Sequence, residues 1–128
     1  MVILDTNIII DHLRRKNGES LLINLSKTIS KEEMAISVVT VQELYEGKST
    51  LNLQDERILL AIITPLNILP YNYEVAHLAG VIARDIKRPI EFVDASIAAT
   101  SILNDAELVT LNKKDFLGIK NLRLFKKF

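Results

Sequence analysis

Val2-Ile3-Leu4-Asp5-Thr6-Asn7, near the start of the chain, contains the first strand signal and the first candidate for chemistry. Its three consecutive apolar residues predict a short buried strand, and the three polar residues after them are of types that cap helices. Apolar residues at helical spacing then run from Ile8 to Leu13. We therefore predict a strand that passes directly into a helix, with Asp5 where the strand ends.

The same alternation of strand and helix patterns continues along the chain. Short apolar segments predict further strands at 35–38, 67–69, 108–109 and 122–124. Apolar residues at helical spacing predict helices at 21–29, 40–45, 54–63, 73–86 and 95–103. Strands that alternate with helices form parallel sheets covered on both faces, and ligands bind beyond the carboxyl ends of such strands. The residues that follow each strand are therefore the first candidates for a site.

The composition is that of one globular domain without cysteine chemistry. The 128 residues match the usual length of a single core, and 48% of them are hydrophobic. No stretch has the composition of a linker, so we predict one domain over residues 1–128. The absence of Cys excludes a disulfide scaffold, a Cys-ligated metal site and a thiol nucleophile.

Charge and hydropathy narrow the class of protein further. The 16 Lys and Arg residues balance the 16 Asp and Glu residues, which argues against a strongly basic nucleic-acid coat protein. The first residues have no basic region of the kind that signal peptides carry. The most apolar segment, 58–69, contains Pro65 and is shorter than the roughly 18 residues of a membrane-spanning helix. We expect a cytoplasmic protein with no membrane contact.

Four carboxylates stand near the predicted carboxyl edge of the sheet: Asp5, Glu43, Asp94 and Asp115. Taken singly, each has a structural interpretation as a helix cap, a turn residue or a solvent-exposed helix residue. Clustered acids repel one another, so a fold tolerates them mainly when a cation is bound. Oxygen ligands of this kind suit Mg²⁺ or Mn²⁺, and the four residues together form a candidate cation site.

Four segments, in this order, resemble the acidic motifs of the PIN-domain ribonucleases: Leu4-Asp5-Thr6-Asn7, the region of Glu43, Asp94-Ala95-Ser96-Ile97-Ala98-Ala99 and Thr110-Leu111-Asn112-Lys113-Lys114-Asp115-Phe116. The size of the chain resembles that of the VapC-type toxins of toxin–antitoxin pairs. The resemblance implies a single PIN domain over 1–128, a PIN-like three-layer α/β/α sandwich with a central, mainly parallel sheet of four or five strands. It also implies an endoribonuclease that depends on Mg²⁺ or Mn²⁺ and acts as a toxin.

The resemblance also assigns roles to the residues of the candidate site. Asp5 and Asp94 are implied as direct ligands of one or two ions, and Glu43 and Asp115 as catalytic residues that ligate directly or through water. The candidates to hydrogen-bond the carboxylates or the phosphate, with plain cap and turn roles as the alternative, are Thr6, Asn7, Thr110 and Asn112. Water activated by a divalent ion needs no His, Cys or Ser nucleophile, and we expect neither histidine to be catalytic.

An RNA substrate, with tRNA and rRNA as candidates, requires cations near the site. The cations close in sequence to the proposed site are Arg14, Arg15, Lys16, Lys87, Arg88, Lys113 and Lys114. Each of them also has an ordinary interpretation as solvated surface. Charge is segregated along the chain, because residues 32–56 have a net charge of −5 and residues 113–128 a net charge of +5.

Two protein partners are expected besides RNA. The segment 58–63 is apolar around much of a predicted helix, which suits a dimer mate, an antitoxin or burial inside the domain. The acidic stretch 32–56 is a candidate landing surface for a basic antitoxin segment. We therefore expect a homodimer and a cognate antitoxin.

Two other functions remain open. A phosphoacceptor receiver-like signalling domain has a similar length and an acidic Mg²⁺ pocket, but it requires an acidic pair after the first strand, where Asp5 is followed by Thr6-Asn7. An inactive PIN-like binding module is the other alternative, and the presence of all four acids argues against it.

Overall fold

The computed structural model describes residues 1–15 and 18–126. Lys16, a predicted RNA contact, and Lys127, which contributes to the basic C-terminal stretch, lie outside these ranges. Among the described residues, no helix has both the length and the apolar character needed to cross a membrane.

Four short parallel strands form the sheet of the described chain: β1 (Val2–Leu4), β2 (Met34–Ser37), β3 (Asn67–Leu69) and β4 (Glu107–Val109). They lie side by side in the order β3-β2-β1-β4. The segment predicted as a last strand, 122–124, forms only one parallel bridge, between Leu124 and Leu108. The sheet therefore has four strands, the lower of the two predicted numbers.

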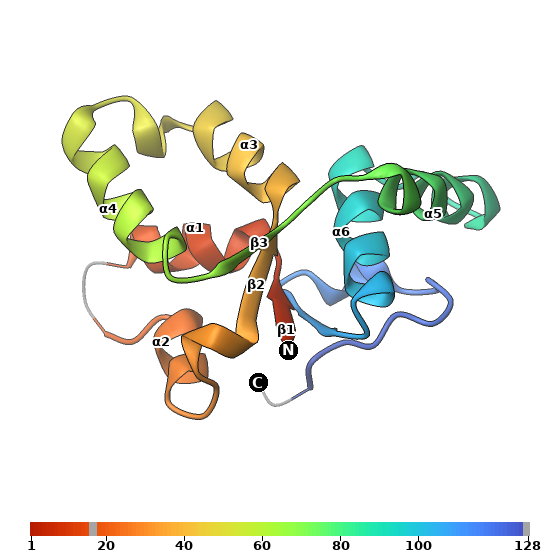
Figure 1. Ribbon diagram of the computed structural model, residues 1–128, viewed down its shortest axis with the longest axis horizontal. Helices are drawn as coiled ribbons and strands as arrows, with labels where there is room; N and C mark the ends of the chain where they lie inside the picture. Colours follow the sequence, from red (N-terminus) through yellow and green to blue (C-terminus); the bar gives the residue numbers. More distant parts are fainter. Residues whose placement is uncertain (16–17, 127–128) are drawn as a thin grey trace.

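Helices lie on both sides of this sheet and make the three predicted layers (Figure 1). One group consists of α1 (Thr6–Arg14), α2 (Leu21–Ser26), α3 (Val38–Glu46) and α4 (Leu53–Ile63). The other side is covered by α5 (Tyr73–Asp85), α6 (Phe92–Leu103) and the 3₁₀ helix η3 (Lys113–Phe116). Two further 3₁₀ turns are η1 (Lys31–Glu33) and η2 (Lys48–Thr50).

Two separate hydrophobic cores form because strand residues point alternately to opposite faces of the sheet. Val2, Leu4 and Ile36 belong to the core beneath α1, α2 and α4. Ile3 and Leu108 belong to the core beneath α5 and α6. All five side chains are buried. Burial on both faces explains why the strands appear in the sequence as continuous apolar runs.

The helix α6 is buried along most of its length, from Ala95 to Ser101. The hydroxyls of Ser96, Thr100 and Ser101 each donate to the carbonyl four residues earlier, so burial leaves them satisfied. The helix begins three residues before the predicted start because Glu91 occupies the cap position. Asp94 therefore lies inside the first turn and is not the cap.

The connections between strands create a reversal beside β1. The chain passes from β1 to β2 and then to β3 in one direction, and it returns to place β4 on the other side of β1. Open parallel sheets bind ligands at the carboxyl ends of strands next to such a reversal. The backbone N–H of Asp5 donates to the carbonyl of Val109 at 2.9 Å, which joins the ends of β1 and β4 at that point.

Ile36→Ala tests whether the strand core is as buried as described. Ile36 is fully buried in β2, so its truncation should lower the free energy of unfolding by about 2–5 kcal/mol. Leu103→Ala is the control, because Leu103 is 48% exposed at the end of α6 and should change stability by no more than about 0.5 kcal/mol. Urea unfolding followed by circular dichroism measures both values, and similar losses in the two variants would contradict the assignment.

Candidate active site

The fold brings the four predicted carboxylates from four different elements to the carboxyl edge of the sheet. Asp5 follows β1 at the cap of α1, and Glu43 lies in the second turn of α3. Asp94 lies in the first turn of α6, and Asp115 lies in η3 after β4. They are close enough to influence one another, because Asp5, Asp115 and Glu43 all raise the pKa of Asp94.

Asp5 is a buried carboxylate held by two hydrogen bonds. Its Oδ1 accepts from the backbone N–H of Thr6 at 2.8 Å, as an N-cap does, and its Oδ2 accepts from the hydroxyl of Thr110 at 2.7 Å. Burial raises the pKa of Asp5 above its ordinary value of 3.8, and the nearby charges of Glu43 and Asp115 add to the rise. The two hydrogen bonds act in the opposite direction. Asp5 is thus both a cap and a member of the acidic cluster.

Glu43 is held by Thr6 of the neighbouring helix α1, which is itself bonded to Thr40 of α3. The Thr6 hydroxyl lies 2.5 Å from Oε1 of Glu43 and 2.9 Å from the hydroxyl of Thr40. A hydroxyl has a single hydrogen to donate, so Thr6 donates to the carboxylate and accepts from Thr40. Thr40 is fully buried and was not among the predicted residues. Its position one helical turn before Glu43 is the signal in the sequence that points to it.

Asp115 is held by its own loop, which is tied to α1. The side chain of Asn112 donates to Oδ2 of Asp115 at 2.5 Å. The backbone N–H of Asn112 donates to the Thr110 hydroxyl, and the amide of Asn7 donates to the same hydroxyl and accepts from the N–H of Leu111. All four predicted polar neighbours of the acids therefore contact a carboxylate or a residue that contacts one.

Asp94 differs from the other three carboxylates because no hydrogen bond holds it in the described chain. It is half-buried in the first turn of α6. Burial, together with the charges of Asp5, Asp115 and Glu43, raises the pKa of Asp94 from 3.8 to about 6. The exposed acid Glu91 contributes the smallest of these charge effects. Of the four carboxylates, Asp94 is therefore the one whose charged form a nearby cation would stabilise most.

The chemistry of this cluster suits a hydrated hard cation. None of the four carboxylates pairs with Lys or Arg in the part of the chain that the structure describes. Within the same residues, no group of three His, Asp or Glu side chains is arranged to hold a metal ion by itself. Mg²⁺ keeps several of its waters in proteins and needs only one or two direct carboxylates. The residues therefore fit an ion that retains part of its water shell.

The predicted cationic contacts have different surroundings. Arg14 and Lys48 line a cavity of about 340 Å³ together with Glu43, and Lys48 was not among the predicted contacts. Arg15 pairs with Asp11, and Arg88 donates to two backbone carbonyls. The exposed cations at the other predicted positions are Lys87, Lys113 and Lys114.

Neither histidine lies among the four acids. His12 is bonded through Nδ1 to the hydroxyl of Ser20 at 2.6 Å, on the side of the sheet covered by α2. His77 is exposed on α5, where its ring stacks on that of Tyr73. Both positions agree with the expectation that the chemistry uses carboxylates.

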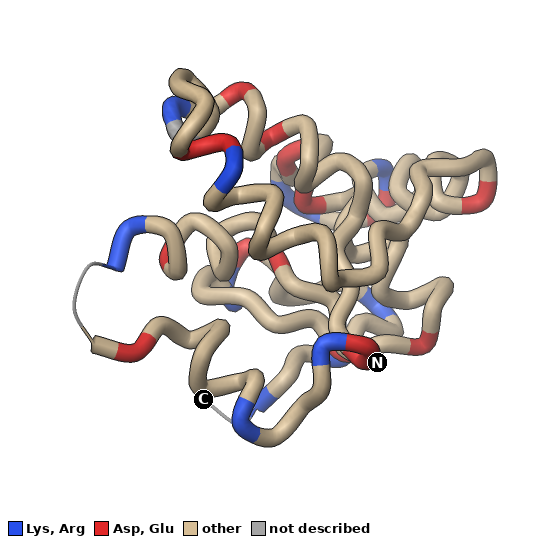
Figure 2. Tube along the Cα trace, turned by 60° about the vertical axis from the view of Figure 1, so that its left-hand side comes forward, with Lys and Arg blue, Asp and Glu red and all other residues tan. Residues whose placement is uncertain are grey.

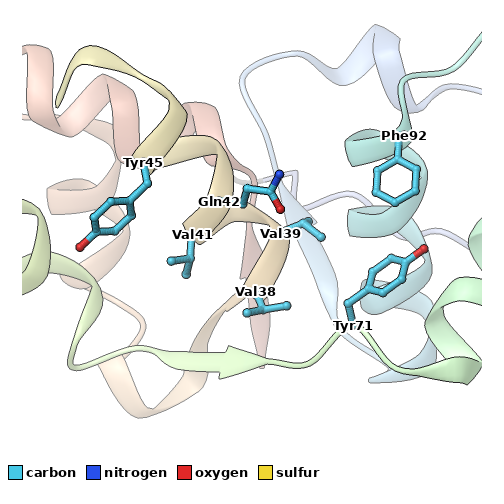
Figure 3. A pocket seen from close by; sticks show the side chains of 7 residues that line it. All are labelled: Val38, Val39, Val41, Gln42, Tyr45, Tyr71 and Phe92. Atoms are coloured by element: carbon cyan, nitrogen blue, oxygen red, sulfur yellow. The ribbon is translucent and has the colours of Figure 1, made fainter. Parts of the chain in front are cut away.

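Two apolar hollows lie on the surface of the described chain, and one of them contains Gln42, the residue before Glu43. The α3 groove runs between α3 and the start of α6, and Figure 3 shows the residues that line it: Val38, Val39, Val41, Gln42, Tyr45, Tyr71 and Phe92. The rings of Tyr71 and Phe92 face each other there, with centroids 5.8 Å apart. The α2–α4 groove has a volume of about 360 Å³ and contains Leu22, Ile58 and Ile62.

Acidic positions concentrate in the upper part of Figure 2, where Figure 1 places α3 and the start of α4.

Comparisons with known proteins match nearly the whole chain. A sequence model of the PIN domain matches residues 2–121. Over 121 residues the chain is 34% identical to Ribonuclease VapC19 of Mycobacterium tuberculosis, an alignment that covers 91% of this chain and 92% of that protein. The fold is similar to that of VapBC2 from Rickettsia felis bound to a DNA fragment from its promoter, with a TM-score of 0.81, 27% identity and coverage of 97% and 96% of the two chains. DNA-bound VapBC from Salmonella typhimurium gives a TM-score of 0.83, 26% identity and coverage of 98% of both chains.

Asp94→Asn tests the electrostatic strain of the cluster. An acid whose pKa is raised on folding stabilises the protein below pH 3.8 and loses that contribution as the pH rises through about 6. Two pKa units correspond to about 3 kcal/mol, which solvent at a half-buried group reduces to about 1–2 kcal/mol. In EDTA at pH 7.5 the variant should exceed the parent in unfolding free energy by that amount, with no difference near pH 3.5.

Urea unfolding at a series of pH values measures this difference. Asp85→Asn is the matched control, because Arg84 lowers the pKa of Asp85 and removal of that charge should give no gain at pH 7.5. A variant of Asp94 that is less stable than the parent at pH 7.5 would contradict the assigned repulsion.

Proposed function

We propose that this chain, which belongs to the PIN-domain family, is a metal-dependent endoribonuclease and the toxin of a toxin–antitoxin pair. The observation that carries the proposal is the group of four mutually repelling carboxylates at the carboxyl edge of the sheet, which lack a countercharge in the described chain. The 34% identity to a protein named as a ribonuclease supports the activity. The likeness to VapBC complexes supports the biological role.

We assign the ion, Mg²⁺ or Mn²⁺ in one or two copies, to Asp5 and Asp94 as direct ligands, with Glu43 and Asp115 ligating directly or through water. When bound, the ion supplies an activated water and neutralises charge on the phosphodiester. The hydroxyls of Thr6 and Thr110 orient Glu43 and Asp5 without neutralising them. Asp94 must be ionised to ligate, so a proton competes with the ion at its carboxylate below about pH 6.

The RNA backbone is expected to approach the cluster along its cationic border. Arg14 and Lys48 share a cavity with Glu43, so they are positioned to contact phosphates next to the reacting one. Lys87, Lys113 and Lys114 are exposed, and the last two belong to η3, the element that carries Asp115. These contacts carry no base specificity, and tRNA and rRNA are both candidate substrates. Such substrates place the proposed action in the cytoplasm.

The antitoxin is expected to occupy the α2–α4 groove. The groove contains two exposed apolar side chains, Ile58 of α4 at 49% and Ile23 of α2 at 37%. Ile58 belongs to the segment 58–63, which is too apolar for one core face. Acids of the 32–56 stretch lie close to it in the chain: Glu32 and Glu33 directly precede Met34 of the groove, and Asp55 lines a neighbouring cavity with Ile58. This charge favours a basic, amphipathic segment of the partner.

A second copy of the chain is expected to cover the α3 groove. Phe92 is 67% exposed there, and Val38 and Tyr45 are about two-fifths exposed. A surface with several exposed aromatic and branched side chains is typical of an interface between subunits. The two apolar hollows thus have separate proposed occupants.

Asp5→Asn and Asp94→Asn test the metal-dependent activity. Each variant keeps the shape of the side chain and removes one ligand charge, so Mn²⁺ binding by calorimetry should weaken about tenfold or more and cleavage of purified tRNA and rRNA should be lost. Parent affinity should also fall between pH 7.5 and 5.5, as Asp94 takes up its proton. Expression of either variant should relieve growth arrest.

Asp85→Asn, on the exposed end of α5, is the control and should retain binding and cleavage. Mn²⁺ binding that is independent of both acids would overturn the site assignment. Incorporation of beryllofluoride at an Asp would favour a receiver-like domain. RNA binding without cleavage would favour an inactive binding module.

Ile58→Asp and Phe92→Ala separate the two proposed interfaces. A carboxylate at Ile58 in the α2–α4 groove should abolish co-purification with the protein encoded beside this chain, because it would desolvate a charge among the apolar contacts of that interface. Removal of the Phe92 ring should weaken self-association about tenfold or more, as loss of an aromatic anchor does. Light scattering and pull-down on both variants measure the two effects, and the opposite pattern would show that the two occupants are exchanged.

A further inference from the structure

Among residues 1–15 and 18–126, Arg88 is the residue whose side chain ties η3 to another part of the fold by hydrogen bonds. It lies between α5 and α6 and is half-buried. Its Nη2 donates to the carbonyl oxygens of Asp115 at 2.9 Å and Leu117 at 2.7 Å. Among the described residues, no other side chain from outside 110–117 hydrogen-bonds to the residues of η3.

The segment that Arg88 holds is weak on its own. A 3₁₀ helix of four residues has poor internal hydrogen bonds, and its last carbonyls have no partner within the helix. A cationic side chain at that end donates hydrogen bonds to free carbonyls, and its positive charge is attracted to the negative end of the helix dipole. The chain then turns away at Gly118, whose φ of +82° suits glycine. Apart from the buried ring of Phe116, Arg88 is the main anchor of this end of η3.

The same segment carries a carboxylate that its neighbours repel. Asp115 raises the pKa of both Asp5 and Asp94, so the three charges oppose being held together. Asn112 orients the Asp115 side chain, but it belongs to the same loop and would move with it. Asn7 ties the start of the loop to α1 at Thr110 and Leu111, so a second hold is needed at the far end, where Asp115 lies.

We propose that Arg88 is a positioning residue that locks η3 and thereby fixes Asp115 at the acidic site. Its effect on metal affinity rests on the proposed function, whereas its effect on η3 does not. The role differs from the phosphate contact expected from the sequence, because Nη2 is already committed to two carbonyls. The adjacent Lys87 is exposed and free of any ion pair or side-chain hydrogen bond in the described chain, so it remains the better candidate for a phosphate.

Arg88→Ala should loosen η3 and weaken the metal site together. Hydrogen exchange at residues 113–118 should become about tenfold or more faster, because two hydrogen bonds to that segment are lost, while β4 keeps its protection. Mn²⁺ affinity measured by calorimetry should fall about tenfold, the usual effect of removing a residue that orients a ligand. Cleavage should lose kcat, with KM and its salt dependence unchanged.

Three further variants separate this role from the alternatives. Arg88→Lys keeps a donor on a long side chain and should recover part of both the protection and the Mn²⁺ affinity. In an Asp115→Asn background, Arg88→Ala should cause no further loss of Mn²⁺ affinity, because both changes act through the same carboxylate. Lys87→Ala should show the reverse of Arg88→Ala, with a higher KM, a weaker salt dependence and unchanged Mn²⁺ affinity.

Arg84→Ala is the control for loss of one positive charge, since Arg84 is exposed and pairs only with its neighbour Asp85, and it should leave every readout unchanged. Arg88→Ala with unchanged exchange at 113–118 would overturn the proposal, as would an additive loss of Mn²⁺ affinity in the Asp115→Asn background. If the parent binds no Mn²⁺, the proposed function fails, and exchange at 113–118 alone decides whether Arg88 locks η3.

Discussion

Repulsion between carboxylates at the edge of the sheet is the constraint on which the rest of this structure depends. Each acid is supplied by a different element, and neutral partners hold three of the four: Thr110 for Asp5, Thr6 for Glu43 and Asn112 for Asp115. Hydroxyls and amides fix the direction of a carboxylate but leave its charge in place. A salt bridge would have stabilised the fold more simply and removed the negative charge that attracts a cation. The arrangement therefore sacrifices stability to keep a charged site open.

The two hydrophobic cores provide the stability that offsets the repulsion between the carboxylates in so small a fold. Alternating side chains of β1 and β2 fill both faces of the sheet, and α6 is buried from Ala95 to Ser101. Asp94 extends from the first turn of this buried helix, and Asp5 follows the central strand directly. Asp94, whose pKa is raised to about 6, is thus attached to a buried helix, which is among the least mobile parts of a domain.

Periodicity predicted nearly every element of the fold, because strand and helix patterns are local in sequence and the strands here are buried on both faces. Periodicity does not predict which strands lie side by side in the sheet. It also did not predict that 122–124 would form a single bridge to β4 and not a full strand. The four acids and their polar neighbours were found through their motifs, although the metal they would bind stays a prediction. The cavity shared by Arg14 and Lys48 and the carbonyl contacts of Arg88 depend on pairings between distant segments, which single-sequence patterns do not contain. The spacing of Thr40 from Glu43 is visible in the sequence, but its hydrogen bond to the distant Thr6 is not.

The pairing of β1 with β4 has a consequence for the time at which the candidate site can first exist. A ribosome adds Asp5 long before its partner Thr110, which follows 105 positions later, and Asp115 comes later still. A growing chain folds from its N-terminal end as it emerges, yet it cannot gather the four carboxylates until nearly nine-tenths of these 128 residues have been made. For a proposed nuclease made beside the RNA of its own ribosome, this topology delays the chemistry until the segment that carries Asp115 has left the ribosome.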